Sequence, residues 1–243
     1  MIRAEGETEP NLKCRRLHPW RVTTAEARGI QQRLGPMVKA AWDGRAVRVV
    51  AGADVGFPDR STVLAAVVVL SYPELKVIET RVARRRCTFP YVPGLLAFRE
   101  APGLLDALKA VKHSVDLLLC DAQGLAHPKG MGLATHVGIL LDRPVVGCAK
   151  SRLYGTSGEV AVKKGSYSYM SDHAGRTIGA ALRTRDSVEP VYVSVGNRID
   201  LHTAIAMVLA CCPRYRIPEP LRLAHRLSIG GEVRLSEMVK EVF

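Results

Sequence analysis

The sequence predicts an α/β fold with a mixed sheet, in which an antiparallel meander is followed by parallel strands and helices flank both faces. Residues 48–84 contain three consecutive apolar segments joined by short turns, a pattern typical of an antiparallel meander. Residues 115–120 and 144–149 are apolar runs that enclose a helical pattern, which is typical of buried parallel strands. The length of 243 residues fits one large α/β domain. We therefore expect a five-stranded mixed sheet in a single domain, residues 1–243.

The first part of the chain supplies the first helix and the meander. Residues 1–20 are polar and are expected to be loosely ordered. Apolar spacing predicts a helix from Thr24 to about Trp42, with Thr23 or Thr24 as its N-cap. The three strands of the meander are expected at residues 48–56, 61–72 and 76–84.

The remainder of the chain alternates helices and strands. Two helices are expected at residues 94–100 and 103–112, separated near Pro102 because proline lacks the N–H that a helix interior needs. The elements expected after them are a strand at 115–120, a helix at 132–141, a strand at 144–149, a hairpin formed by 158–164 and 177–184, a strand at 191–195 and a helix at 200–211 capped by Asp200. The Arg-rich tail from Pro213 is expected to be partly irregular.

The charge balance indicates a polyanionic partner. Lys and Arg number 35 against 23 Asp and Glu, which gives a net charge of +12. This surplus of positive charge favours a nucleic acid as the binding partner, because basic side chains that neutralise phosphates release the bound counterions and so favour binding. The alternative is a generally basic surface that has no such partner.

The cysteines and the hydropathy pattern indicate a cytoplasmic protein. The six cysteines form no CxxC pair, and Cys120 and Cys148 fall in apolar segments, where they are expected to be small core residues. No apolar run approaches the roughly 18 residues of a membrane span, and the N-terminus lacks the apolar segment of a secretory signal. We therefore expect a reduced, cytoplasmic protein that does not contact membranes.

Three acidic residues are candidates for chemistry. Asp54 and Asp121 lie at the carboxyl ends of expected strands, where functional groups of parallel sheets gather, and Glu100 ends the expected helix before Pro102. Converging carboxylates form an oxygen-rich site for a hard cation such as Mg²⁺, which can activate water for phosphodiester cleavage. The alternative for Asp54 is an ordinary strand-end carboxylate that accepts backbone hydrogen bonds.

Three further residues, near these acids in the sequence or at the ends of other expected elements, are candidates for contact with a substrate. His127 lies in the glycine-rich loop after Asp121, where it suits proton transfer or phosphate contact, although a lone histidine is usually structural. Lys150 ends another expected strand and could hold a phosphate oxygen or remain a solvated lysine. Tyr91, in the stiff PYVP segment at 90–93, could be a wedge between bases. On this stretch alone, a packed tyrosine is the favoured interpretation.

Five motifs, in order from about Val49 to His225, resemble the endonuclease V family, metal-dependent nucleases that act at deaminated purines. They are AGADVGF (51–57), PYVPGLLAFRE (90–100), GLAHPKGMGLATHVG (124–138), PVVGCAKSRLYG (144–155) and YRIPEPLRLAH (215–225). The resemblance implies a ribonuclease-H-like fold and a DNA repair endonuclease. The implied reaction is nicking of the second phosphodiester bond 3′ to deoxyinosine and related deaminated bases, with Mg²⁺ as cofactor and Mn²⁺ able to substitute.

The resemblance also implies roles for particular residues. Asp54, Glu100 and Asp121 match the metal-binding acids, and His225 falls where the family places a residue close to the metal. The residues expected to be catalytic are Asp54, Glu100, Asp121, His127 and Lys150. Lys150 is also expected to bind substrate.

The remaining expected contacts are to the substrate. Tyr91, braced by Pro93, matches the strand-separating wedge of the family. Gly94 and Leu96 match backbone positions that read the extruded hypoxanthine. Gly124 is expected to let the backbone turn close to the substrate. The expected partner is DNA that contains deoxyinosine, and the protein is expected to be a monomer.

The sequence departs from the family at one position. The family usually has glycine directly after the second aspartate of the site, whereas this chain has Ala122 after Asp121. If that position needs positive φ, alanine costs roughly 1 kcal/mol or more.

Two alternative functions remain open. An inosine-specific endoribonuclease would use the same fold, because only contacts to the 2′-hydroxyl distinguish RNA from DNA. A non-catalytic binder of deaminated nucleic acid is the alternative from another class, and three intact acids argue against it.

Overall fold

The computed structural model describes residues 12–233, and these form one mixed sheet with helices on both faces. The strands are β1 (Val49–Asp59), β2 (Thr62–Ser71), β3 (Val77–Arg86), β4 (Leu117–Cys120), β5 (Val145–Ala149), β6 (Thr156–Ser157), β7 (Tyr167–Ser171), β8 (Thr177–Leu182) and β9 (Val191–Asn197). The helices are α1 (Thr24–Leu34), α2 (Leu96–Lys109), α3 (Leu133–Leu141), α4 (Leu201–Ala210) and α5 (Glu219–Ser228).

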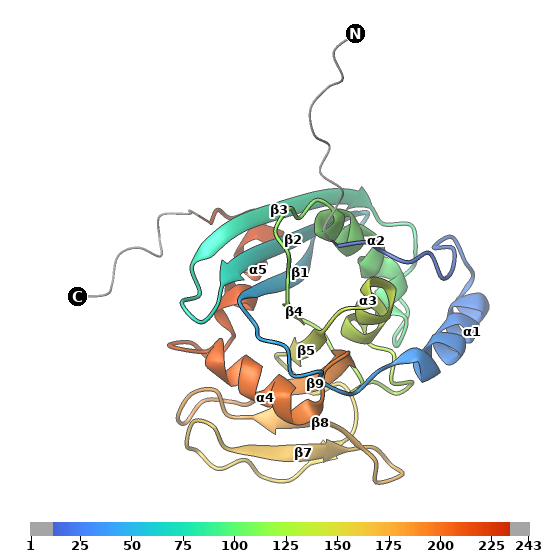
Figure 1. Ribbon diagram of the computed structural model, residues 1–243. Coiled ribbons are helices and arrows are strands. Elements are labelled where there is room, and N and C mark those ends of the chain that lie inside the picture. The colour runs from blue at the N-terminus through green and yellow to red at the C-terminus, as the bar shows by residue number, and fades with distance from the viewer. Residues whose placement is uncertain (1–11, 234–243) are drawn as a thin grey trace.

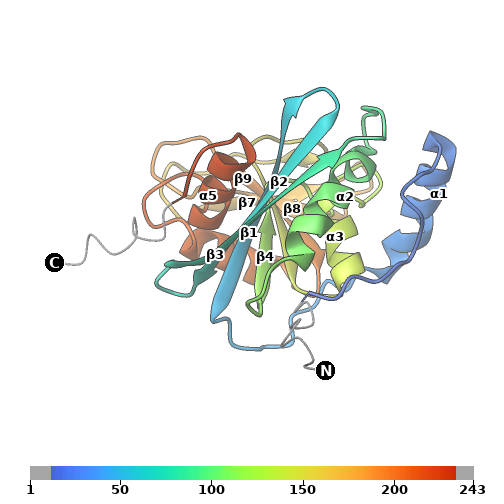
Figure 2. The same ribbon diagram turned by 90° about the horizontal axis from the view of Figure 1, so that it is seen from above.

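The sheet divides the molecule into layers. Its order is β3-β2-β1-β4-β5-β9-β8-β7-β6. Helices α2 and α3 cover one face and helices α4 and α5 the other, while α1 lies beyond α3 (Figure 1 and Figure 2). The predicted fold class, a ribonuclease-H-like mixed sheet flanked by helices, is confirmed.

Strand direction brings Asp54 and Asp121 together. Strands β1, β2 and β3 form the antiparallel meander, and β1, β4 and β5 run parallel to one another. Ala53 of β1 lies opposite Cys120 of β4. Asp54 follows Ala53 within β1 and Asp121 directly follows β4, and the Asp121 N–H donates to the Ala53 carbonyl at 3.0 Å. The parallel register therefore places the two carboxylates side by side at one edge of the sheet.

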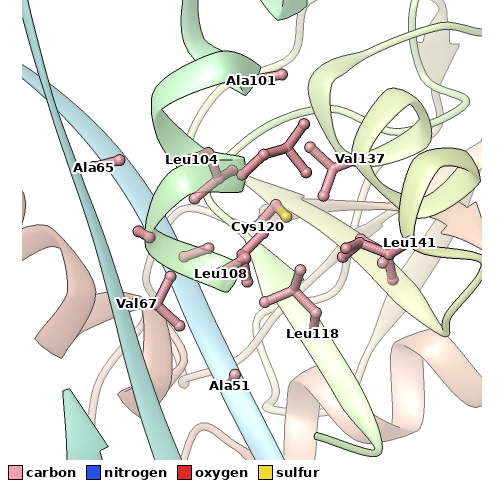
Figure 3. Packing of buried hydrophobic residues seen from close by; sticks show 14 of the residues in the cluster. Ala51, Ala65, Val67, Ala101, Leu104, Leu108, Leu118, Cys120, Val137 and Leu141 are labelled. Atoms are coloured by element: carbon pink, nitrogen blue, oxygen red, sulfur yellow. The ribbon is translucent and has the colours of Figure 1, made fainter. Parts of the chain in front are cut away.

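Apolar side chains form a buried core on each face of the sheet. Between the sheet and helices α2 and α3, Figure 3 shows Leu104, Leu108 and Val137 around Cys120. A second buried cluster lies between the sheet and helices α4 and α5. Each fully buried leucine contributes about 1.5–3 kcal/mol, so the strands that carry the acids are rigidly supported.

Two predictions for the first helices are wrong. Helix α1 begins at the Thr23 cap, as one alternative predicted, but ends at Leu34 instead of Trp42 because Pro36 follows in a 3₁₀ turn. Helix α2 is continuous through Pro102, where a break was predicted. A mid-helix proline costs about 3 kcal/mol, and burial of one whole face of α2 offsets that cost. Glu100 consequently lies inside a rigid helix.

The second half of the sheet also differs from the prediction. Within residues 12–233 the sheet has nine strands and not five, because β9 pairs antiparallel with β5 and continues the sheet to β8, β7 and β6. Residues 158–164 do not form the predicted strand; the partner of β8 is β7. The Arg183 guanidinium binds the carbonyls of Val160, Ala161 and Val188, and these bonds hold the segment as a loop.

The C-terminal part of the described chain is more regular than expected. Asp200 caps α4, as predicted, with its carboxylate accepting from the Thr203 N–H at 2.9 Å. The tail forms the amphipathic helix α5, which buries Leu221 and Leu223 against the sheet. Pro220 lies in the first turn of α5, where proline is tolerated.

Residues 12–20 pack on the domain, contrary to the expected loose N-terminus. Leu12 is buried, and the Arg15 N–H donates to the Leu140 carbonyl at 2.8 Å. The Trp20 ring stacks on the His136 ring with centroids 5.3 Å apart. Residues 1–11 of that prediction lie outside the described residues.

Cys120 and Cys148 are buried core residues, as predicted, and both are free thiols. In the portion of the chain that the structure describes, no helix is both long enough and apolar enough to span a bilayer.

Candidate active site

A pocket of about 440 Å³ opens beside the middle of β1 and the ends of β4 and β5. Asp54 lies in the middle of β1 and not at the expected strand end, because β1 continues to Asp59 in its pairing with β2. The walls of the pocket come from β1 and the ends of β4 and β5, from the PYVP segment, from the start of α2 and from the loop after β4. The predicted site residues that line it are Asp54, Tyr91, Pro93, Gly94, Leu96, Glu100, Asp121, His127 and Lys150. The fold thus gathers into one pocket residues that are spread over almost a hundred positions of the sequence.

The acids of the pocket repel one another. Asp54, Asp121 and His225 each offer a ligand atom, and these atoms all lie within 4.8 Å of one another. Glu100 faces the same pocket from α2. Burial, and next the charge of Asp54, raise the pKa of Glu100 to about 8. Burial also raises the pKa of Asp121, against the opposing effect of Lys150.

Lys150 is held against Asp121 by its side chain and by its backbone. Its Nζ lies 2.5 Å from Asp121 Oδ2. The Lys150 carbonyl accepts from the Arg216 guanidinium at 2.6 Å, and the next carbonyl, that of Ser151, accepts from Gln123 Nε2 at 2.9 Å. Arg216 and Gln123 were not among the predicted residues, because neither contact follows from sequence spacing.

Helix α5 supplies two partners for Asp54. His225 Nδ1 lies 2.8 Å from Asp54 Oδ2, and Ser228 Oγ donates to the same oxygen at 2.7 Å. His225 therefore reaches the acidic group, as expected, although it does not line the pocket itself. No sequence pattern singles out Ser228, because a serine at the end of an amphipathic helix resembles any other helix terminus.

His127 is a buried, neutral imidazole. Burial lowers its pKa to about 4. Its Nδ1 accepts from the Lys129 N–H at 3.1 Å, so the neutral ring carries its proton on Nε2, and the ring also hydrogen-bonds the backbone of Gly94. Gly94 has a φ of +79°, which glycine adopts readily. The histidine thus braces the PYVP segment from inside the pocket.

The mouth of the pocket carries an exposed aromatic ring. Tyr91 is 72% exposed and projects between two prolines, which fix the backbone on either side of it. The packed tyrosine favoured from this stretch alone does not occur. An exposed, rigidly mounted ring beside the acids suits contact with a base.

Gly124 and Ala122 differ from what the sequence suggested. Gly124 does not line the pocket. Its N–H donates to Ser194 Oγ at 2.8 Å, and a Cβ there would lie 2.2 Å from the Val195 carbonyl oxygen, so glycine is needed for packing against β9.

The backbone at Ala122 does not need a glycine. Among the described non-glycine residues, positive φ occurs only at Leu75, Asp142, Ser187 and Arg198. Ala122 consequently carries no left-handed strain, and the departure from glycine has no backbone cost.

The raised pKa of Glu100 predicts that stability depends on pH. The folded chain holds this proton up to about pH 8, whereas the ordinary pKa is 4.5. Binding of this proton to Glu100 stabilises the folded state relative to the unfolded state. This contribution is fully present below pH 4.5, the ordinary pKa, and is lost as the pH rises to about 8. In EDTA, the free energy of unfolding from urea titrations should fall by several kcal/mol over this range, since each pKa unit is worth about 1.4 kcal/mol. Glu100→Gln should flatten this fall, and an equal slope in both proteins would contradict the assignment.

A ribonuclease-H-like sheet that brings carboxylates together on its central parallel strands, on a basic protein, is the arrangement of a nuclease. The comparisons with known proteins identify the particular family. The model of the endonuclease V family matches residues 33–226. The chain belongs to the endonuclease V family, which confirms the resemblance seen in the sequence.

The relatives cover nearly the whole chain. Endonuclease V from Roseiflexus sp. is 49% identical over 215 residues, which span 88% of this chain and 96% of the relative. The crystal structure of endonuclease V from Streptomyces avermitilis is 41% identical, with a TM-score of 0.83 over 89% of this chain and 96% of that chain. Ciona intestinalis endonuclease V, in complex with a 24mer DNA containing an inosine followed by a ribo-adenosine, is 26% identical, with a TM-score of 0.72 over 84% of this chain and 95% of that chain.

Proposed function

We propose that this protein is a divalent-metal-dependent DNA repair endonuclease, which nicks the second phosphodiester bond 3′ to deoxyinosine and related deaminated bases. The observation that carries the proposal is the close group of Asp54, Asp121 and His225 beside Glu100 and Lys150. Membership of the endonuclease V family supports it, as does the inosine-containing DNA bound by the Ciona relative.

The residues of the pocket fit a divalent cation. Asp54, Glu100 and Asp121 supply buried carboxylate oxygens, the donors that Mg²⁺ and Mn²⁺ prefer, and His225 adds a nitrogen. Burial and, next, the charge of Asp54 raise the pKa of Glu100, and a cation bound beside Glu100 would favour its ionised form. These four residues would hold Mg²⁺, with Mn²⁺ able to substitute. A bound divalent cation supplies Lewis acidity toward phosphate oxygens and lowers the pKa of coordinated water.

The other pocket residues orient the nucleic acid. The ammonium of Lys150, now paired with Asp121, can pair with a phosphate oxygen of the cleaved strand and stabilise charge that develops there. His127, a neutral imidazole in the same pocket, is proposed to assist catalysis by proton transfer or phosphate contact. Gly94 and Leu96 line the pocket where an extruded base would enter, and their backbone groups are proposed to read it.

Tyr91, braced by Pro93, is the proposed wedge. Tyr91→Ala should lower kcat/KM on a duplex with a single deoxyinosine about tenfold or more, since base stacking on an aromatic ring is worth ~1–3 kcal/mol. The same lesion in a single strand needs no separation, so it should be nicked nearly as fast as by the wild type. Tyr91→Phe keeps the ring and is the matched control. Equal losses on both substrates would show that Tyr91 does not separate strands.

The choice between DNA and RNA is tested by matched substrates. We propose deoxyinosine-containing DNA as the partner of a monomeric, cytoplasmic enzyme, and inosine-containing RNA as the alternative. Oligonucleotides of one sequence, with a single deoxyinosine or a single inosine, should show faster nicking of the DNA in Mg²⁺. Faster cleavage of the RNA would assign the protein as an endoribonuclease.

A non-catalytic binder of deaminated nucleic acid predicts a different result. Its binding would be indifferent to divalent cations, and no cleaved product would appear. A gel assay that resolves both shifted complex and product, with Mg²⁺ or with EDTA, separates the two functions. The buried, mutually repelling carboxylates argue for the enzyme, because a binding site for phosphates gains nothing from them.

A further inference from the structure

Ser228, the last residue of α5, is a buried hydroxyl that touches a proposed metal ligand. Its side chain is 1% exposed. The Oγ lies 2.7 Å from Asp54 Oδ2 and 2.9 Å from the carbonyl oxygen of His225. The Asp54 carboxylate and the His225 carbonyl are both hydrogen-bond acceptors, whereas the Ser228 hydroxyl has a single proton to donate. A hydrogen bond to the charged carboxylate is stronger than one to the neutral carbonyl. The hydroxyl therefore donates to Asp54 when that acid is ionised.

Both partners of Asp54 bind the same oxygen. His225 Nδ1 lies 2.8 Å from Oδ2, the oxygen that also accepts from Ser228. Within residues 12–233, these are the side-chain hydrogen bonds of the Asp54 carboxylate, and they hold its plane at a fixed angle. They leave Oδ1 as the oxygen available to a cation. Outer contacts of this kind orient carboxylates that bind metals.

Two glycines of β1 fix the position of α5 and hence of Ser228. A Cβ at Gly52 would lie 2.2 Å from the Pro220 carbonyl oxygen, and a Cβ at Gly56 would lie 2.1 Å from the Ser228 carbonyl oxygen. The backbone of α5 therefore rests directly on β1 near both of its ends, as the adjacent ribbons in Figure 2 show. Asp54 lies between the two glycines in the sequence. Contacts on either side of it leave the Ser228 hydroxyl little freedom to move away.

We infer that Ser228 is a positioning residue, which orients the Asp54 carboxylate for a divalent cation. The inference rests on the proposed metal dependence of the site. Ser228 lies beyond the end of the family match at residue 226, so that match assigns it nothing. It does not line the pocket, and its hydroxyl reaches the site through Asp54.

The test is the affinity of the intact protein for Mn²⁺, measured calorimetrically without nucleic acid. Ser228→Ala should weaken Mn²⁺ binding about tenfold or more, the usual effect of losing such an outer contact. At saturating Mn²⁺, KM for the oligonucleotide should stay at the wild-type value. Ser228→Thr retains the hydroxyl and should retain the affinity. Ile229→Ala changes the next residue, which is 67% exposed, and should leave Mn²⁺ binding unchanged.

The outcomes separate this inference from the proposed function. If folded Ser228→Ala binds Mn²⁺ as the wild type does, Ser228 is merely structural and the inference is wrong, even if the melting temperature falls. If Ser228→Ala does not fold, Ser228→Thr and Ser228→Val replace it, since they share a shape and differ in the hydroxyl. Weaker binding by the valine variant supports the inference, and equal binding overturns it. A wild type that binds no Mn²⁺ overturns the proposed metal dependence, and the inference with it.

Discussion

Asp54→Ala and Asp121→Ala are each expected to abolish nicking while largely sparing the binding of DNA. Loss of either carboxylate removes an oxygen donor from the group within 4.8 Å that is proposed to hold the cation. The rate should fall by about a hundredfold to a thousandfold or more, the scale on which the loss of one charge-stabilising group slows an enzyme. Single-turnover nicking of an end-labelled deoxyinosine duplex measures the rate, and a gel shift measures binding.

An acid on the same strand provides the control for this loss. Asp59 ends β1 but its nearest ionic partner is Arg84, at 3.9 Å, and it does not line the pocket. Asp59→Ala should therefore nick as the wild type does. Full activity in either Asp54→Ala or Asp121→Ala would refute the assignment of the site. Thermal unfolding of each variant shows whether lost activity reflects lost structure.

Gly124→Ala is expected to destabilise the fold and not to impair substrate binding. The added Cβ would lie 2.2 Å from the Val195 carbonyl oxygen, a backbone atom that moves only if β9 moves. Overpacking of this severity costs about 3 kcal/mol or more, which lowers Tm by about 6–12 °C in a domain of this size. KM for the oligonucleotide should remain unchanged in the fraction that stays folded.

Gly29 offers the opposite case within the same chain. A Cβ at Gly29, in helix α1, meets no atom within 4 Å, so Gly29→Ala should raise stability by about 0.5–1 kcal/mol through helix propensity. Calorimetric melting of both variants checks the pair. An unchanged Tm with a raised KM for Gly124→Ala would instead restore the substrate-contacting role that the family resemblance implied.

The acids of the site were predictable because strand direction is visible in the sequence. Asp54 and Asp121 each follow a buried apolar run, so the prediction that they meet required only that the two strands lie side by side, and the structure pairs β1 with β4. Glu100 was placed correctly near them, although the sequence suggested a helix end. The helix in fact continues, because burial of its face offsets the cost of Pro102, and that balance depends on tertiary packing.

The contacts of α5 could not be predicted in the same way. Ser228 and Asp54 are 174 residues apart, and the approach of α5 depends on the absence of side chains at Gly52 and Gly56. Either glycine could equally mark a bulge or a bend in a strand. Strands β8 and β9 were expected as strands, but β6 and β7 and the nine-stranded continuation of the sheet were not. The bonds of Arg183 keep residues 158–164 in a loop, so β7 and not that segment pairs with β8.

The central claim is that the carboxylates of Asp54, within β1, and of Asp121, directly after β4, support metal-dependent cleavage beside a deaminated base. The most direct measurement is nicking of an end-labelled duplex with one deoxyinosine, mapped at single-nucleotide resolution in Mg²⁺ and in EDTA. The account predicts one nick at the second phosphodiester bond 3′ to the lesion in Mg²⁺, and an intact strand in EDTA. An equal rate of cleavage in EDTA, or binding with an intact strand in both conditions, would contradict it.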